Sequence, residues 1–206
     1  MKPFLTAIAL MLAMSGVAHA QLPPPGFGLA CSNLSLRVAD EAFAAGRYAD
    51  ALAIWHPCAE QGDANAQGNL GFMYAEGQGV PQDYAEAVRW YRLAAEQGDA
   101  FAQASLGFMY ENGRGVPQDY AEAVRWYRLA AEQRNALAQN NLGFMYTEGR
   151  GVPQDDAEAH MWFNIAAANG EAGAATERDR VAAGMTAAQI AEAQRLAREW
   201  FAAHPN

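Results

Sequence analysis

Side chains that could do covalent chemistry are few and widely separated in this sequence. Beyond residue 20, the serines and histidines are Ser32, Ser35, Ser105, His56, His160 and His204. Serine acyl transfer needs a nucleophile activated by a neighbouring base, as in an S-x-x-K motif or a G-x-S-x-G turn. The only lysine is Lys2, and no serine stands in either motif. The sequence therefore predicts a protein that is not an enzyme, and a hydrolase acting on the cell wall is the least supported alternative.

Metal or cofactor binding has equally little support from the spacing. His56 and Cys58 are the only pair of His or Cys residues at ligand spacing, whereas a metal site needs three or four ligands. We therefore expect no metal and no cofactor. His160 stands where the equivalent residues are Val88 and Val124, which favours a hydrogen-bonded structural histidine over a catalytic base.

The first twenty residues have the pattern of an export signal. Lys2 precedes an apolar run over residues 4–17, and Ala18-His19-Ala20 forms an A-x-A cleavage site. The run is shorter than the roughly 20 residues that span a bilayer. We predict a signal peptide over 1–20 and a periplasmic or secreted mature protein that is not inserted in a membrane. Residues 21–34, with three consecutive prolines, are expected to be extended.

Cys31 and Cys58 are the two cysteines of a chain that is expected to leave the reducing cytosol. An oxidising compartment favours a disulfide, which would stabilise the fold by about 3 kcal/mol through the loop that it closes. The alternative is that Cys58 is a small core residue, because Ala94, Ala130 and Ala166 occupy the equivalent positions. We expect the disulfide, although sequence cannot demonstrate the proximity that it requires.

The charge of the chain argues against nucleic acid as a partner. The formal net charge is −9, and loss of Lys2 with the leader makes the mature chain more acidic still. No basic run interrupts this excess of acidic residues. Such a chain repels polyphosphate.

A repeat of 36 residues organises the middle of the sequence. The segment Leu70-Gly71-Phe72-Met73-Tyr74 returns from residue 106 and again from residue 142. The turn segment that begins at Gly77 returns at Gly113 and Gly149. A period between 20 and 50 residues is typical of stacked supersecondary units that bury their apolar faces against one another.

Each unit is predicted to contain two helices. Asp63, Asp99 and Asn135 are expected to cap the first helices, and Asp83, with Glu86 at capping-box spacing, the second helix of the first unit. Arg92 and Glu96 are spaced for an ion pair on the solvated side of that helix. We expect core positions for the recurring aromatic residues Tyr74, Tyr110, Tyr146, Trp90, Trp126 and Trp162.

These motifs resemble the Sel1-like repeat family, a relative of tetratricopeptide repeats. The resemblance rests on the Leu-Gly-x-Met-Tyr, Gly-x-Gly-Val and Ala-x-x-Trp-Tyr elements and covers residues 63–170. It implies an all-α, right-handed superhelix of helix pairs, in which the first helix of each pair lines a concave groove. We assign a leading repeat to 35–62, Sel1-like repeats to 63–98, 99–134 and 135–170, and capping helices to 171–206. Members of the family act as adaptors, which predicts a protein or peptide partner here.

The candidate partner-binding residues lie one face away from the core stripe of each first helix. They are Asn65, Asn69, Phe72, Glu76, Phe101, Ser105, Phe108, Asn112, Leu137, Asn141, Phe144 and Glu148. Phe72, Phe108 and Phe144 could form a ladder of aromatic anchors, or each could pack against the neighbouring repeat. Periodicity leaves both interpretations open. Amide and aromatic groups facing one groove would also suit peptidoglycan or another glycan, which is the alternative function.

Overall fold

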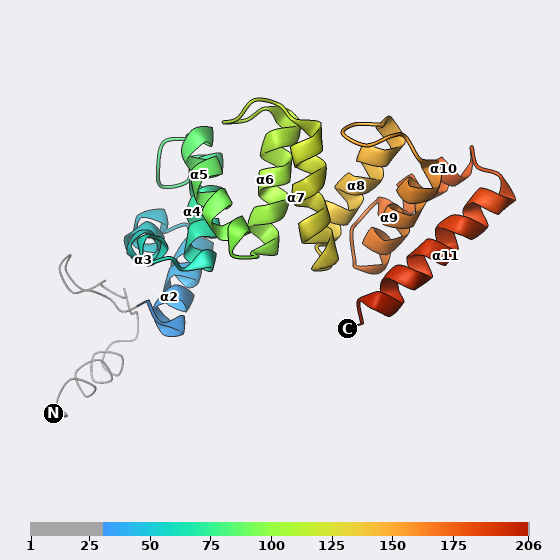
Figure 1. Ribbon diagram of the computed structural model, residues 1–206. Coiled ribbons are helices and arrows are strands. Elements are labelled where there is room, and N and C mark those ends of the chain that lie inside the picture. The colour runs from blue at the N-terminus through green and yellow to red at the C-terminus, as the bar shows by residue number, and fades with distance from the viewer. Residues whose placement is uncertain (1–30, 206) are drawn as a thin grey trace, which may run out of the picture.

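The computed structural model describes residues 31–205, and the export signal expected at 1–20 lies outside them. Ten α-helices and no strand are found in the described part of the chain, which confirms the all-α solenoid (Figure 1). The helices are α2 (Asn33–Ala44), α3 (Tyr48–Glu60), α4 (Ala64–Glu76), α5 (Tyr84–Glu96), α6 (Ala100–Asn112), α7 (Tyr120–Glu132), α8 (Ala136–Glu148), α9 (Asp156–Ala168), α10 (Ala174–Ala182) and α11 (Ala187–Ala203).

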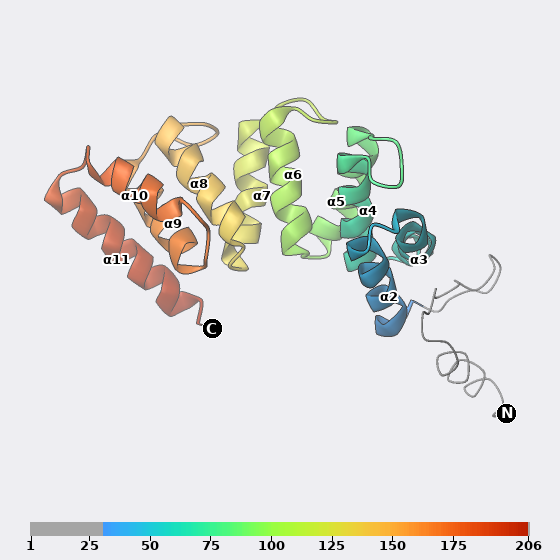
Figure 2. The same ribbon diagram turned by 180° about the vertical axis from the view of Figure 1, so that it is seen from behind.

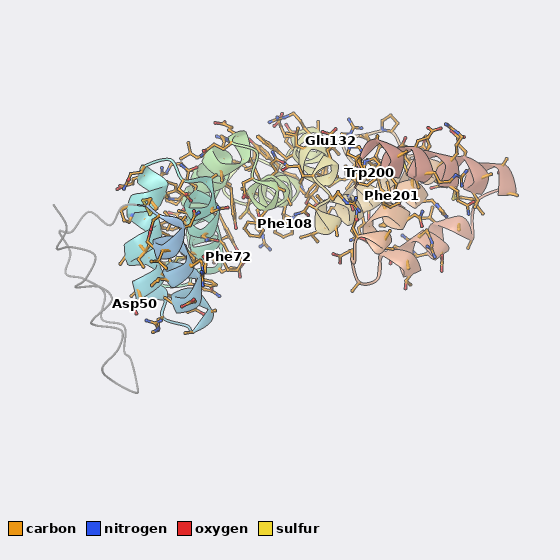
Figure 3. The ribbon with its side chains drawn as sticks, turned by 90° about the horizontal axis from the view of Figure 1, so that it is seen from below. Asp50, Phe72, Phe108, Glu132, Trp200 and Phe201 are labelled. Carbon is orange, nitrogen blue, oxygen red and sulfur yellow. A yellow bond between two sulfur atoms is a disulfide. The ribbon has the colours of Figure 1, made fainter. Side chains whose placement is uncertain are left out.

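The helices pack in sequence order along a bent row. Antiparallel pairs run from α2 with α3 at one end to α8 with α9, and α10 and α11 finish the row at the other end (Figures 1 and 2). The view from below shows the bend of the row (Figure 3). Most contacts join neighbours in the chain, but α11 reaches back to pack on α9. The row is therefore a stack of local units rather than a single globular core.

Acidic or amide side chains begin the helices as expected. The Asp63, Asp99 and Asn135 side chains accept a hydrogen bond from the backbone N–H three residues later, at 2.8, 2.6 and 2.9 Å. Asp83 accepts from the amides of Ala85 and Glu86. The return bond of a capping box is absent at this described helix end, because the Glu86 carboxylate binds Arg89 instead, at 2.8 Å. These caps fix the start of each helix within one residue.

The glycines of the turn have two different physical roles. Gly113 ends α6 in the left-handed region at φ 64° and donates its backbone N–H to Met109. Gly115 lies so close to the Tyr84 carbonyl of the preceding unit that a Cβ atom there would collide with it. The first glycine therefore ends a helix, and the second lets two units approach each other.

The core is built from small and aromatic side chains alternating along the stack. Trp90, Trp126 and Trp162 are buried, as predicted. Gly107 provides the space in α6 into which the ring of Tyr127 packs. Equivalent pairs are Gly71 with Tyr91 and Gly143 with Phe163. Close packing of this kind holds the two helices of each unit together.

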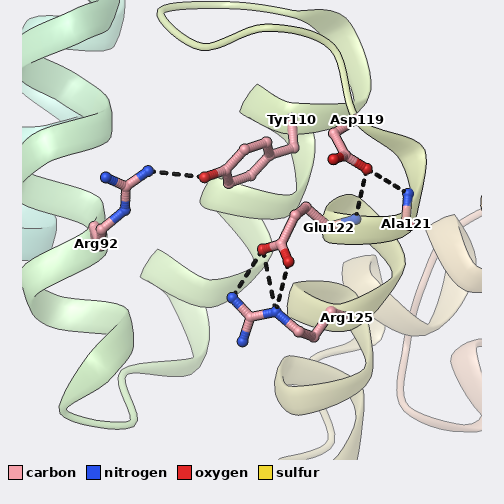
Figure 4. Close-up of polar contacts among 6 residues, drawn as sticks. All are labelled: Arg92, Tyr110, Asp119, Ala121, Glu122 and Arg125. Carbon is pink, nitrogen blue, oxygen red and sulfur yellow. Dashed lines mark hydrogen bonds and ion pairs between the residues drawn. The ribbon is translucent and has the colours of Figure 1, made fainter.

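Tyr74, Tyr110 and Tyr146 differ from the prediction because each is only half buried. The Tyr110 hydroxyl accepts a hydrogen bond from the Arg92 guanidinium of the preceding unit at 2.8 Å (Figure 4). The Tyr146 hydroxyl accepts one from Arg128 at 2.7 Å. Arg92 therefore does not pair with Glu96. The prediction considered a single helix, whereas α5 in the stack lies beside α6, which brings Tyr110 within reach.

The two ends of the stack are stabilised by different kinds of bond. Cys31 and Cys58 form the expected disulfide, with their Cα atoms 5.3 Å apart, and Cys58 is also fully buried. At the other end, Arg134 adopts a left-handed conformation at φ 65°, where Gly62, Gly98 and Gly170 stand in the other units. Its guanidinium donates to the His204 carbonyl at 2.9 Å and to Asn169 Oδ1 at 2.8 Å. Arg134 thereby ties the end of α11 to the stack.

Candidate partner-binding surface

All twelve candidate residues lie on the first helices of the three central units, α4, α6 and α8, and none is buried. The exposed residues are Asn65, Glu76, Phe101, Phe108, Asn112, Leu137 and Glu148. The half-buried ones are Asn69, Phe72, Ser105, Asn141 and Phe144. We call these twelve residues together the first-helix surface.

Three large apolar side chains stand out on the first-helix surface. Phe101 is 47% exposed, Phe108 40% and Leu137 53%. Single exposed apolar side chains are common on protein surfaces, but several gathered on one face mark an interaction site. Leu93 and Leu129, on the second helices, are 38% and 37% exposed and offer a comparison on another face of the same units.

The three recurring phenylalanines do not share one environment. Phe72 packs between Phe43 of the leading unit and Phe101 of the next, with ring centroids 5.9 and 6.2 Å away. Phe144 packs edge-on against Phe163 of its own unit, at 5.0 Å. Phe108 is exposed, and the Arg114 guanidinium lies 5.1 Å from its ring centroid. Figure 3 shows Phe72 and Phe108 one after the other along the row. Inter-repeat packing therefore describes Phe72, and only Phe108 has the exposure of an anchor.

A hollow of about 420 Å³ lies where α2, α4 and α6 meet. It brings together three of the candidate residues, Asn65, Asn69 and Phe101, beside Asp40 and the buried Trp55. The indole N–H of Trp55 has no hydrogen-bond partner within residues 31–205. A hollow with an apolar wall and two amides is suited to hold a side chain or ring that carries hydrogen-bonding groups.

Sequence reasoning missed the residues that the leading unit contributes to this hollow. Asp40, Trp55 and Leu36 lie before the first recognisable repeat, so the 36-residue comparison gave them no role. A partial signal was present, because Trp55 aligns with Tyr91 and Tyr127. Both of those tyrosines are buried behind the first-helix surface.

Two of the candidate residues also form hydrogen bonds with the buried tyrosines behind them. Burial raises the pKa of Tyr91, and a hydrogen bond with Ser105 partly opposes this shift. Burial raises the pKa of Tyr127 too, and the Glu111 carboxylate, which accepts from its hydroxyl at 2.7 Å, raises it further. Asn141 binds the same hydroxyl and acts in the opposite direction. Ser105 and Asn141 therefore offer a partner only part of their hydrogen-bonding capacity.

The histidine expectation needs a correction. His160 is only 4% exposed, yet its Nδ1 has no hydrogen-bond partner among the described residues. Desolvation lowers its pKa, and the positive charge of Arg178 lowers it further. The predicted hydrogen bond is not found at Nδ1: the ring lies on α9 beside residues of α10 and α11, and none of the described residues places a partner at that atom.

Residues 31–205 contain no cluster of three or more His, Cys, Asp and Glu side chains arranged to hold a metal ion. Within the same range, no helix has both the length and the apolar character needed to cross a bilayer.

The repeat of this chain is a known one. A model of the Sel1 repeat matches residues 64–99, 100–135 and 136–171. The chain belongs to the Sel1 repeat family. Sel1 repeat proteins are helical scaffolds, generally without enzymatic activity and typically engaged in protein interaction.

Solved Sel1 repeat structures agree with this assignment. A protective antigen of uropathogenic Escherichia coli strains, described as displaying an SLR fold, is 41% identical with a TM-score of 0.65. A Sel1 repeat protein from Oxalobacter formigenes is 37% identical, also with a TM-score of 0.65. Each likeness covers 68% of this chain, but only 31% of the first protein and 56% of the second. No curated protein matches the sequence.

Proposed function

We propose that this protein is an exported, non-enzymatic Sel1 repeat adaptor that binds an extended segment of another protein on its first-helix surface. The observation that carries the proposal is the exposure of Phe101, Phe108 and Leu137 along two successive first helices. Burying such side chains drives association, and large aromatic residues commonly supply most of the binding energy at interfaces.

The polar surroundings suggest the character of the bound segment. Asn65 and Asn112 can bind the backbone of an extended chain, since an amide both donates and accepts hydrogen bonds. Glu76 is exposed on the same surface and gives it a negative charge, whereas the exposed Glu148 is paired with Arg150 at 2.6 Å. A segment with apolar side chains spaced between basic or uncharged ones would match this pattern.

Export is supported by the pattern of residues 1–20 and by the Cys31–Cys58 disulfide. Disulfides persist in the periplasm and outside the cell and are rare in the cytosol. We therefore expect the partner to be periplasmic or extracellular as well.

A glycan such as peptidoglycan is the second candidate ligand, and the hollow beside Trp55 favours it. Asn65, Asn69 and Phe101 would suit a sugar ring with its hydroxyl groups. A cell-wall hydrolase is a third and weaker possibility, for which turnover of a β-lactam reporter is the test.

Photo-crosslinking from position 108 in cell-envelope extract tests the adaptor proposal. We expect capture of a protein, and capture that survives digestion of the extract with muramidase. A captured species that disappears after digestion would favour the glycan instead. Capture from position 129 on α7, but not from position 108, would overturn the choice of surface.

A matched pair of variants makes the experiment quantitative. Phe101→Ala with Leu137→Ala should weaken binding of the captured partner by at least about tenfold, because each removes a large apolar contact. Leu93→Ala with Leu129→Ala removes a similar exposed area from the second helices and should change binding by less than about twofold. Equal losses in the two double variants would contradict the proposal.

A further inference from the structure

A second hollow, of about 520 Å³, lies at the C-terminal end of the stack. It is bounded by α9, α10 and α11, of which α10 and α11 both pack on α9 (Figure 2). The twelve residues of the first-helix surface have no part in its lining. Its volume falls in the range of pockets that hold small molecules.

Polar groups without partners face this hollow. His160 lines it from α9, with an Nδ1 atom that is unpaired although the residue is 96% buried. Gln194 and Arg198 line it from α11; both are solvent-exposed, and neither forms a side-chain hydrogen bond or ion pair within residues 31–205. Buried polar groups in native proteins are normally satisfied, so an unpaired one beside a hollow indicates a missing ligand.

The charges in the hollow add up to a single uncompensated cation. The Arg178 guanidinium donates to Asp179 Oδ1 at 2.7 Å and to Asn164 Oδ1 at 3.3 Å, so its charge is already balanced. Arg198 has no acidic partner in the described residues. This positive site contrasts with the formal charge of −9 for the whole chain. A ligand with one negative charge would balance Arg198, whereas a phosphate dianion would leave a charge in excess.

The apolar lining of the hollow indicates the chemical character of the rest of the ligand. Ile190, Ala197 and Phe201 present apolar surface opposite the polar groups. A guanidinium binds a carboxylate through two parallel hydrogen bonds, and an aliphatic or aromatic body would fill the apolar side. We propose that this hollow binds a small monocarboxylate with an apolar body, with Arg198 holding the carboxylate and His160 and Gln194 completing its hydrogen bonds.

The proposal does not depend on the first-helix surface and can be tested without knowing the protein partner. The full chain, labelled on histidine and arginine, would be titrated with benzoate, benzamide and inorganic phosphate while the NMR signals of His160 and Arg198 are followed. We expect saturable shifts with benzoate, none with benzamide, and at least about tenfold weaker binding of phosphate, since charged hydrogen bonds need the matching group. His56, on α3 at the far end of the stack, provides an unaffected reference signal.

Variants of α11 distinguish a specific site from general attraction to positive charge. Arg198→Gln should weaken benzoate at least about tenfold. Arg195→Gln removes the same charge three residues earlier, where the arginine is paired with Glu192 and Glu199, and should change affinity by less than about twofold. Arg198→Lys, which keeps the charge without the planar fork, should give an intermediate affinity. Equal effects of Arg198→Gln and Arg195→Gln, benzamide or phosphate binding as well as benzoate, or the absence of any saturable shift would overturn the proposal.

Discussion

The Nε2 of Gln97 donates a hydrogen bond to the Oε1 of Gln67, 2.7 Å away and 30 residues earlier in the chain. Gln67 is buried, and its own Nε2 donates a hydrogen bond to the Ala59 carbonyl of the preceding unit at 3.0 Å. The same relay joins Gln133 to Gln103 at 2.8 Å and Asn169 to Gln139 at 2.8 Å. Each joint between units therefore contains one buried amide that binds groups from both sides.

Gln103→Leu should destabilise the fold by about 1 to 2 kcal/mol, because it removes two bonds of one buried relay; the Ala95 carbonyl keeps its bond from the Gly98 N–H. Urea denaturation followed by circular dichroism would measure the change. Gln61→Leu is the control, since Gln61 is exposed and forms no side-chain hydrogen bond in the described residues. Equal stabilities of the two variants would show that the relay contributes nothing.

The same substitution at two glycines should have opposite effects. At Gly107 an added Cβ would lie 2.6 Å from the Tyr127 ring, so Gly107→Ala should destabilise by roughly 2 kcal/mol or more. At Gly68 the closest atom would be 3.6 Å away, so Gly68→Ala should stabilise α4 by up to about 1 kcal/mol through helix propensity. Thermal unfolding of both variants is the measurement, and a stabilising Gly107→Ala would contradict the packing described for the α6–α7 pair.

Removing the disulfide should weaken the leading unit. Cys31 and Cys58 are 27 residues apart, and a loop of this length is worth about 3 kcal/mol in the chain-entropy model. The variant Cys31→Ser with Cys58→Ala suits the site, because alanine occupies the equivalent buried position in the other units. We expect the melting temperature of the unmodified chain to fall on reduction and that of the variant to be insensitive to reductant. If reductant lowered the melting temperature of the variant as well, its effect on the unmodified chain could not be attributed to this disulfide.

His160 should make the fold sensitive to mild acid. Its pKa in the folded state lies below the ordinary value of 6.5, because it is desolvated and close to Arg178. The unfolded chain therefore takes up a proton first as the pH falls through 6.5, and stability decreases from there toward the folded-state pKa. His160→Val, which introduces the residue found at 88 and 124, should remove this part of the pH dependence. Urea denaturation at pH 7.5 and pH 5 would measure it, and an unchanged pH dependence in the variant would contradict this account.

The sequence predicted the features that depend on one helix or one turn. The caps at Asp63, Asp99 and Asn135 follow from residue type and spacing, and the period defined the units. The sequence could not predict bonds between helices that are distant in the chain. Gln67 looked like an ordinary polar residue, because its burial depends on how α4 is rotated against α3 and α5.

The same limit applies to the candidate sites. Periodicity treated Phe72, Phe108 and Phe144 alike and left two roles open for all three, but each has different neighbours from the adjoining helices, so only Phe108 remains exposed. The hollow beside Trp55 and the one beside His160 both involve an end unit, where the repeat pattern is weakest. Sites that form between a repeat and a divergent end cannot be found by comparing repeats with each other.

The helices α5 and α7 have the same thirteen-residue sequence, YAEAVRWYRLAAE, and each meets the next unit through an arginine–tyrosine bond and through an alanine carbonyl near its end that accepts a hydrogen bond from a glutamine of that unit. A further copy of this module inserted between them would find matching groups before and after it. In-frame duplication or deletion of a gene segment encoding 36 residues would thus alter the span of the array without requiring any new interface to evolve. Variation in length among descendants of this gene is an expected evolutionary outcome, whereas the disulfide-linked start and the α11 finish would be inherited unchanged.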